Sequence, residues 1–428
     1  MTEQTVLSSA RPRTAPSPVT APAAPRPGPA GRISGRPALY LLASLIVSLL
    51  AASAAPTPLY ATYAQSWGFT PVTTTVIFGV YAVAVLASLL VFGSLSDHIG
   101  RRPLLIAGLG MQVPVMLLFA FAGDLEVLLA ARVLQGLATG AALGAIGAGL
   151  VDLHPTRGPV ANASSLMAGT ASGSLLSALF VSLLPAPTEL VYLFLAGVFL
   201  LQALGVTRIA ETAARVPGAR RALAPKLELP PQVRGPLLVA APVLVAVWTL
   251  GGFYASLGPS LAQLVAGDRS MILGGAALFL LAGSGSATVL RFHQVEPRRL
   301  ALFGALAVIF GSALLVAGVA QRSLPLFTLG VFPAGAGFGA GFQGGLRTIV
   351  SAAEPHQRAG VISVVYVISY LSLGLPAVLA GTLVVHSSLP QVAEELGAAV
   401  IVLATLTAIG LAWSLRRESR VAGACPAL

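Results

Sequence analysis

PALYLLASLIVSLLAASAAPTPLYATYAQSWGFTPVTTTVIFGVYAVAVLASLLVFGSLS, residues 37–96, contains no Asp, Glu, Lys or Arg. One crossing of a lipid bilayer needs about 20 apolar residues. The 60-residue stretch is therefore long enough for two crossings joined by a turn at residues 65–71, QSWGFTP. The polar residues that follow must then lie on the side of the membrane from which the stretch began.

The composition of the whole chain agrees with a membrane protein. Hydrophobic residues make up 56% and charged residues 9%, whereas soluble domains carry about 25% charged residues. The same reasoning along the chain predicts an all-α membrane protein with twelve transmembrane helices in two six-helix halves. The predicted cores are 38–60, 72–92, 103–122, 127–150, 163–184, 190–207, 236–257, 271–290, 300–320, 325–349, 360–385 and 394–414.

The distribution of basic residues predicts the orientation. With the N-terminus inside, 21 of the 25 Lys and Arg residues lie in inner segments, two in outer loops, and two, Arg132 and Arg347, in spans. Basic residues in short loops favour the cytoplasmic side, so both termini are expected in the cytoplasm. The net charge of +11 is spread over segments that would face anionic lipid, and we expect no nucleic-acid partner.

Polar segments divide the chain into five parts. Residues 1–36 are rich in Pro, Ala and Arg and are predicted to be a disordered cytoplasmic tail. The longest polar connection, residues 208–235, is predicted to be a cytoplasmic loop between two six-helix halves, residues 37–207 and 236–415. Residues 416–428 are expected to form a second cytoplasmic tail.

An internal repeat about 200 residues apart supports two related halves. Residues 136–157, GLATGAALGAIGAGLVDLHPTR, correspond to residues 336–358, AGFGAGFQGGLRTIVSAAEPHQR. Small residues four apart let helices approach closely in lipid, so both glycine stripes predict packing grooves. The stripe glycines are Gly136, Gly140, Gly144, Gly337, Gly341 and Gly345. Parallel repeats of this kind are found in secondary transporters, whose solute site lies between the halves.

Two motifs carry a resemblance to a known family. GSLSDHIGRRP, residues 93–103, resembles the G-x-L-x-D-x-x-G-R-R/K loop of the major facilitator superfamily, and RVLQG, residues 132–136, resembles its R-x-x-Q-G element. The resemblance covers roughly residues 37–415. Two features depart from the pattern: His98 replaces a basic residue, and the second-half loop RFHQVEPRR, residues 291–299, lacks the Gly-x-x-x-Asp part.

The resemblance implies a conformational latch at the inner ends of the helices. Arg101 is expected to pair with Asp152, while Asp97 interacts with the positive N-terminal end of the eleventh span. Such a latch would form when the inner side closes and break when it opens. Its predicted members are Gly93, Asp97, Gly100, Arg101, Arg102 and Asp152.

Candidate solute or coupling residues lie in the spans that the family uses to line its cavity. The prolines of APTPLY, residues 55–60, remove helical donors, which is tolerable at depth only against protein or a watery cavity. Ionisable residues within a membrane are functional candidates, although an arginine near a span end can also reach water along its stem. The candidates are Thr57, Tyr60, Arg132, Gln135, Trp248, Tyr254, Gln343, Arg347, Tyr366 and Tyr370.

The predicted spans hold no Asp or Glu at mid-depth. Because a buried organic cation would need an acidic partner, we expect a neutral or anionic solute. Span five, GTASGSLLSA from residue 169, partly resembles the G-x-x-x-G-P-x-x-G-G element of exporters in the superfamily. Gly169 and Gly173 match, and Ser174 replaces the proline.

These features together predict a secondary active transporter that moves a small organic solute by alternating access, as a proton-linked exporter in the bacterial inner membrane. One alternative is an uptake symporter or facilitator for a sugar or organic acid, and another is a membrane sensor or scaffold that transports nothing. We expect a monomer whose partners are the solute, protons and membrane lipid. The histidines are scattered over separate loops, so no metal site is expected. The sequence shows no cluster of nucleophile, base or metal ligands that would face one cavity, so we expect no other cofactor and no enzymatic activity.

Overall fold

The computed structural model describes residues 33–213, 216–225, 227–267, 271–354 and 356–423. Twelve helices in this part of the chain are long and apolar enough to cross a membrane, which confirms the predicted fold class. The first half contains α1 (Gly35–Ala54), α2 (Pro56–Trp67), α3 (Pro71–Phe92), α4 (Ser96–Ile99), α5 (Arg101–Ala120), α6 (Leu125–Leu153), α7 (Arg157–Leu183) and α8 (Pro187–Thr207). After α9 (Ala219–Ala222), the second half contains α10 (Pro231–Ser256), α11 (Gly258–Ala266), α12 (Met271–Phe292), α13 (Pro297–Ala320), α14 (Leu324–Ser351), α15 (Arg358–His386) and α16 (Leu389–Gly423).

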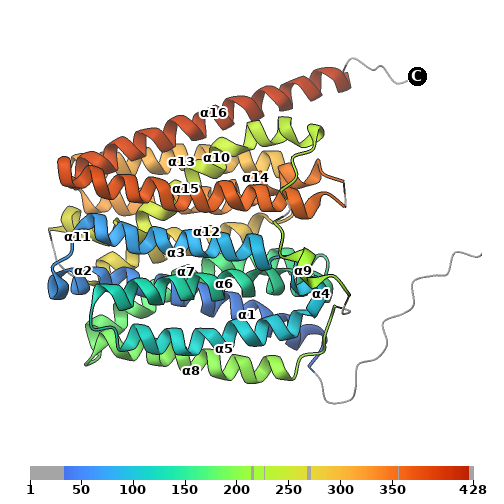
Figure 1. Cartoon of the computed structure of the whole chain (residues 1–428). Helices are drawn as coiled ribbons and strands as arrows, with labels where there is room; N and C mark the ends of the chain where they lie inside the picture. The colour runs from blue at the N-terminus through green and yellow to red at the C-terminus, as the bar shows by residue number, and fades with distance from the viewer. Residues whose placement is uncertain (1–32, 214–215, 226, 268–270, 355, 424–428) are drawn as a thin grey trace, which may run out of the picture.

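In Figure 1, α1 to α8 lie in the lower part of the bundle and α10 and α13 to α16 in the upper part, with α11 and α12 at the height of α3. The end of the bundle that carries α4 and α9 was predicted to face the cytoplasm, and we call it the predicted inner end. The end that carries α2 and α11 is the predicted outer end. The twelve spans are therefore stacked roughly side by side between these two ends (Figure 1).

The helix bounds in the structure differ in detail from the predicted bounds of the two tails and the central loop. Residues 1–32 and 424–428 lie outside the described residues, and α1 begins at Gly35. At the other end of the chain, α16 continues to Gly423, beyond the predicted end of the last span. The predicted loop 208–235 contains the short helix α9, and α10 already begins at Pro231.

The first helix of each half is broken near the predicted outer end. The first span divides into α1 and α2 at Ala55, and the seventh divides into α10 and α11 at Leu257. Proline has no N–H and clashes with the preceding turn of a helix, and each break is followed at once by prolines: Pro56 in α2 and Pro259 in α11. The sequence analysis did not predict α11.

Two helix pairs make the most extensive contacts between the halves. α3 packs against α15, and α7 packs against α12. In the second pair, Ser174 Oγ donates to the Gly275 carbonyl at 2.9 Å, and Ser286 Oγ donates to the Ser164 carbonyl at 3.1 Å. These side-chain hydrogen bonds satisfy polar groups between helices where lipid offers no partner.

The glycines of the first stripe lie at the contact between α6 and α3. A Cβ at Gly136 would lie 2.6 Å from the Ala84 Cβ on α3, and a Cβ at Gly140 would lie 2.6 Å from the Val85 carbonyl oxygen. Gly144 approaches Gly93, which ends the same neighbouring helix. These glycines therefore let α6 and α3 approach closely.

The glycines of the second stripe also lie at close helix contacts, but they face two different neighbours. Gly337 faces Val308 on α13, whereas Gly341 and Gly345 face α10. The surface of α14 that packs against α12, the counterpart of α3, carries Gly335 and Gly339 instead. The seven-residue spacing on the other side of α14 brings Gly330, Gly337 and Gly344 against α13, and this second use of glycine divides the predicted stripe.

Gly169 and Gly173 form a third close contact, between α7 and α1. A Cβ at Gly169 would lie 2.5 Å from the Val47 carbonyl oxygen, and a Cβ at Gly173 would overlap the backbone of Ala51. The glycine pair that resembled an exporter element thus holds α7 directly against the helix that precedes the first proline break.

Candidate functional site

The break in the first span creates free backbone acceptors inside the bundle. Pro56 has no N–H, so it cannot donate to the carbonyl of Ala52 four residues earlier. The side chain of Gln135 on α6 fills this gap, because its Nε2 donates to the Ala52 carbonyl at 3.0 Å. Gln135, in the sequence element RVLQG, therefore supplies the hydrogen bond to Ala52 that Pro56 cannot make.

Arg132, one helical turn before Gln135, is fully buried beside the same break. Its Nη1 donates to the Ser53 carbonyl at 3.0 Å and to Gln135 Oε1 at 2.7 Å, and its Nη2 donates to the Tyr60 hydroxyl. Arg132, Gln135 and Tyr60, three of the predicted candidates, thus form one hydrogen-bonded cluster, which we call the Arg132 cluster.

Aromatic rings surround the Arg132 guanidinium. Its central carbon lies 5.7 Å from the ring centroid of Tyr60, 5.3 Å from that of Tyr81 and 5.6 Å from that of Phe119. Cations within about 6 Å of an aromatic face are attracted by its quadrupole, by about 2 kcal/mol or more when desolvated. The rings therefore lower part of the cost of burying this charge.

Within the described part of the chain, no carboxylate lies within 4.0 Å of Arg132, and its Nε has no hydrogen-bond partner. Removing an ion from water costs several kcal/mol even after the protein relaxes. Hydrogen bonds and aromatic rings offset that cost, but they carry no net negative charge. The Arg132 cluster is therefore a buried, positively charged centre.

A cavity lies between the halves, next to this cluster. It encloses about 740 Å³, including solvent at its mouth, and its wall is almost entirely apolar. Three predicted candidates, Thr57, Trp248 and Tyr370, line it. The other lining residues, which the sequence analysis did not single out, are Leu50, Ser53, Ala54, Phe78, Tyr81, Leu166, Met167, Thr170, Gly251, Ala255, Leu278, Leu281, Ala282, Phe338 and Leu373. We call this space the central cavity.

Arg132 does not line the central cavity itself, but it contacts two residues that do. Ser53, whose carbonyl accepts from Arg132, and Tyr81, whose ring faces the guanidinium, both line the cavity. Ser53 lies one helical turn before Thr57, a spacing that could have indicated a shared face. The charge can therefore act on a bound molecule through a thin wall of low polarity.

The second-half wall of the cavity carries three aromatic side chains, Trp248, Phe338 and Tyr370. Trp248 contacts Phe338 edge-on at 5.8 Å between ring centroids and lies 5.6 Å from Tyr370. Tyr366 packs against Tyr370 at 6.4 Å but is not part of the cavity lining. This wall presents ring faces and edges, whereas the first-half wall lies over the positive charge.

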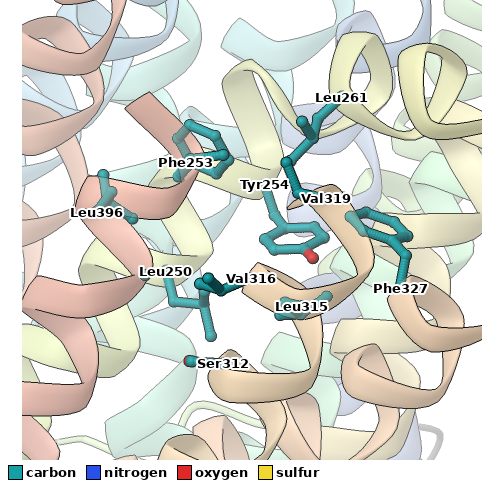
Figure 2. Close-up of a pocket in the computed structure, with 12 residues that line it drawn as sticks. Leu250, Phe253, Tyr254, Leu261, Ser312, Leu315, Val316, Val319, Phe327 and Leu396 are labelled. Atoms are coloured by element: carbon teal, nitrogen blue, oxygen red, sulfur yellow. The ribbon is translucent and has the colours of Figure 1, made fainter. Parts of the chain in front are cut away.

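Three candidates lie elsewhere. Arg347 Nη1 donates to the carbonyls of His293 and Val295, each at 3.0 Å, next to the predicted inner end of α12. Gln343 is buried, and its Oε1 has no partner among the described residues. Tyr254 lines a separate pocket in the second half rather than the central cavity (Figure 2).

The predicted inner end carries the charged loop. Arg101 Nε lies 3.3 Å from Asp152 Oδ2, the predicted pair, and Arg101 Nη1 bonds both Ser96 Oγ and Asp97 Oδ1. Asp97 therefore shares Arg101 with Asp152 in this structure, and its contact with the N-terminus of α15 stays a prediction. Arg102 donates to the Thr207 carbonyl at the end of α8.

Glu211, which the sequence analysis overlooked, caps the helix that follows this loop. Its carboxylate accepts from the main-chain N–H groups of Arg101 at 2.8 Å and Arg102 at 3.1 Å, where helix N-terminal donors are otherwise unsatisfied. Gly100 has φ +99°, and a Cβ there would lie 2.6 Å from Glu211 Oε2. Only glycine combines this backbone conformation with the close approach of the carboxylate.

The described residues contain no group of three or more His, Cys, Asp or Glu side chains that could hold a metal ion. Twelve spans in two halves, with a cavity between the halves lined from both, define a polytopic secondary transporter. Residues 40–294 match the sequence profile of the Major Facilitator Superfamily. The chain belongs to this superfamily, and it accordingly moves a small-molecule solute across a membrane.

No curated protein sequence matches the chain. Among solved structures, the chain is similar to the human organic anion transporter MFSD10 (TETRAN). The two share 17% sequence identity with a TM-score of 0.64, over 86% of this chain and 98% of the human chain. At this identity the likeness shows the fold alone.

Proposed function

We propose that this protein exports a small neutral or anionic organic solute by alternating access, in exchange for protons, with the solute held in the central cavity. The observation that carries the proposal is the buried charge of Arg132 behind the wall formed by Ser53 and Tyr81. No acidic side chain among the described residues lines that cavity.

Electrostatics favours this class of solute. Charge interactions are much stronger in an apolar site than in water, so Arg132 attracts a carboxylate or a polar group with its negative end toward the wall. An organic cation would meet the same field without an acidic partner, and burying it would be costly. The aromatic side chains of Trp248, Phe338 and Tyr370 suit a solute with a planar apolar body.

The structural likeness to a human organic anion transporter is compatible with this solute class. Export is supported by Gly169 and Gly173, which bring α7 against α1 beside the proline break and match the exporter element in part. The distribution of basic residues favours both termini in the cytoplasm. We further propose that the protein is a monomer in the bacterial plasma membrane.

Three naphthalene derivatives of similar shape test the solute class: 2-naphthoate, 2-naphthalenemethanol and 2-naphthylmethylamine, which are negative, neutral and positive at neutral pH. Binding to the purified full chain in lipid nanodiscs is expected for the first two and to be weakest for the amine. Tightest binding of the amine would contradict the proposal. The compounds that bind are then loaded into proteoliposomes. An inward proton gradient should accelerate their efflux, because protons enter as the solute leaves.

A further inference from the structure

The central cavity is closed toward the predicted inner end by residues from both halves. On α12, Ala282 lines the cavity, whereas Gly285, three residues nearer that end, does not. On α10, which starts at the predicted inner end, Trp248 is the lining residue nearest to it. Leu166 and Met167 are the corresponding lining residues of α7. We call this side of the cavity its floor.

Met167 belongs to the first half but is buried in the core of the second half. Its side chain is 2% exposed. It packs in one cluster with Trp248, Phe338 and Phe342, and among the described residues every other buried member of this cluster lies between residues 233 and 404. The side chain of Met167 therefore reaches across the boundary between the halves at the floor of the cavity.

Glycines on two helices of the second half leave room for this side chain. A Cβ at Gly285 on α12 would lie 2.9 Å from Met167 Sδ and 3.0 Å from the Gly335 carbonyl oxygen on α14. The same Cβ would lie 3.5 Å from the main-chain nitrogen of Gly339. Because Gly285 has no side chain, there is a notch where α12 crosses α14, and the thioether of Met167 occupies it.

The contact between Met167 and the notch depends on how the halves are arranged. Slightly nearer the predicted inner end, Ser286 Oγ donates to the Ser164 carbonyl at 3.1 Å, so α7 and α12 are joined there as well. Separating these two helices at that end would draw Met167 out of the notch. Exposing a buried apolar side chain is unfavourable, so the contact favours the state that is closed at the inner end. Methionine is unbranched and has three rotatable bonds, so its side chain can leave the notch without a change in the α7 backbone.

We propose that Met167 is the gate at the floor of the central cavity. Its side chain, inserted where α12 crosses α14, keeps the cavity closed toward the predicted inner end and leaves the notch when the halves separate there. A solute in the cavity reaches that end only after Met167 has moved. The inference rests on the central cavity as the solute site of the proposed function, and it adds the residue that controls access from one end.

The test measures how fast a membrane-impermeant thiol reagent reaches the cavity from each side. The reporter is Ser53→Cys in the cavity wall, in the full chain with Cys425→Ser, and the reagent is a charged methanethiosulfonate added to inside-out or right-side-out membrane vesicles. In Met167→Ala the rate from the predicted inner side should rise roughly tenfold or more, because truncating a buried methionine removes much packing. The rate from the outer side should not rise. Met167→Leu nearly keeps the volume of the side chain and should stay within about threefold of the unchanged gate.

Met116→Ala serves as the matched control. Met116 is 0% exposed within the first-half core, so its truncation should lower the unfolding temperature without changing either labelling rate. Met167→Val, which removes less of the side chain, should give a smaller rise and keeps the test decisive in the event that Met167→Ala does not fold.

Three results would overturn the gate: an unchanged inner-side rate in Met167→Ala, an equal rise in Met116→Ala or Met167→Leu, or a rise confined to the outer side. The labelling needs no solute, so its outcome is separate from that of the solute class. If the inner-side rate rises as expected while none of the naphthalene compounds binds, the gate is supported and the proposed solute class is wrong.

Discussion

Thr57 Oγ1 donates a hydrogen bond of 3.0 Å to the main-chain carbonyl of Ala255, so the break in the first helix of one half is joined to the break in the first helix of the other. The Ala255 carbonyl is available because Pro259, four residues later, has no N–H. Pro56 frees the Ala52 carbonyl in the same way, but that acceptor is taken within its own half by Gln135. The Ala52 carbonyl is therefore paired within the first half. The Ala255 carbonyl is paired across the interface between the halves.

Replacing Thr57 by Val removes this junction and keeps the size of the side chain. We expect the predicted outer end to open more often, by roughly fivefold, because a net hydrogen bond contributes about 1 kcal/mol. The measurement is the alkylation rate of Ser53→Cys, in the cavity wall, by a membrane-impermeant reagent added from outside. Thr62→Val, on the same helix, should leave the rate unchanged, and an equal rise in both variants would argue against the junction.

Changes at Arg132 should separate its charge from its hydrogen bonds. In Arg132→Gln, the preference for 2-naphthoate over 2-naphthalenemethanol should fall, because the positive charge behind the cavity wall is gone. Arg132→Lys should retain much of that preference but unfold at a lower temperature, since the ammonium group cannot replace the planar fork of donors. Arg347→Gln should leave the ratio of affinities unchanged. If the ratio of the affinities for 2-naphthoate and 2-naphthalenemethanol stays constant in Arg132→Gln, the charge of Arg132 does not determine which solute is bound.

Asp97→Asn tests the charged loop at the predicted inner end. The Asp97 side chain is 56% exposed, and exposed ion pairs contribute about 0–1 kcal/mol, so the unfolding temperature should change little. Solute flux in proteoliposomes should nevertheless fall several-fold if Asp97 and Asp152 exchange Arg101 during the transport cycle. Glu189→Gln, at an exposed carboxylate of the predicted outer end, should retain normal flux. Equal flux in wild type and Asp97→Asn would mean that the charged loop only sets the orientation of the helices in the membrane.

Gly173→Ala should be strongly destabilising, because the added methyl group would overlap the Ala51 backbone and push α7 away from α1. Overpacking a well-packed contact costs about 1–3 kcal/mol. At Gly197, also in a membrane-spanning helix, a Cβ would have no heavy atom within 4 Å, so Gly197→Ala should be neutral or slightly stabilising. Thermal unfolding of the two variants in detergent gives the comparison, and similar unfolding temperatures would contradict the close α7 to α1 contact.

The features that could be predicted from the sequence are those that the apolar interior of a membrane requires. Each crossing must be apolar and satisfy its own backbone, so the twelve spans could be recognised. The same rule identified the prolines around Thr57 and the ionisable Arg132 as unusual. Thr57 lines the central cavity, and Arg132 bonds the carbonyl of Ser53 in the cavity wall. The pairing partner of Arg101, Asp152, was also named from the sequence, and the two side chains are in contact.

Other features depend on packing that no local pattern encodes. Tyr254 was assigned to the central cavity, but α10 has two buried faces and Tyr254 lies on the other one. Ser53 and Tyr81 are ordinary residue types in membrane helices, so their position beside Arg132 needs the folded arrangement. Glu211 lies in a polar connection, where its role as a helix cap depends on a neighbour 110 residues away in sequence. The groove-forming Gly335 and Gly339 are two residues out of step with the predicted stripe.

The central claim is that solute moves when the two halves separate and rejoin at opposite ends of the cavity. The most direct measurement places cysteines at Thr57 and Ala255 in a Cys425→Ser background and joins them with a short bis-methanethiosulfonate reagent. In proteoliposomes, flux of the naphthalene compound that binds should stop in the cross-linked protein and return when the link is reduced. Flux at the uncross-linked rate, in protein that is fully cross-linked, would contradict alternating access through the central cavity.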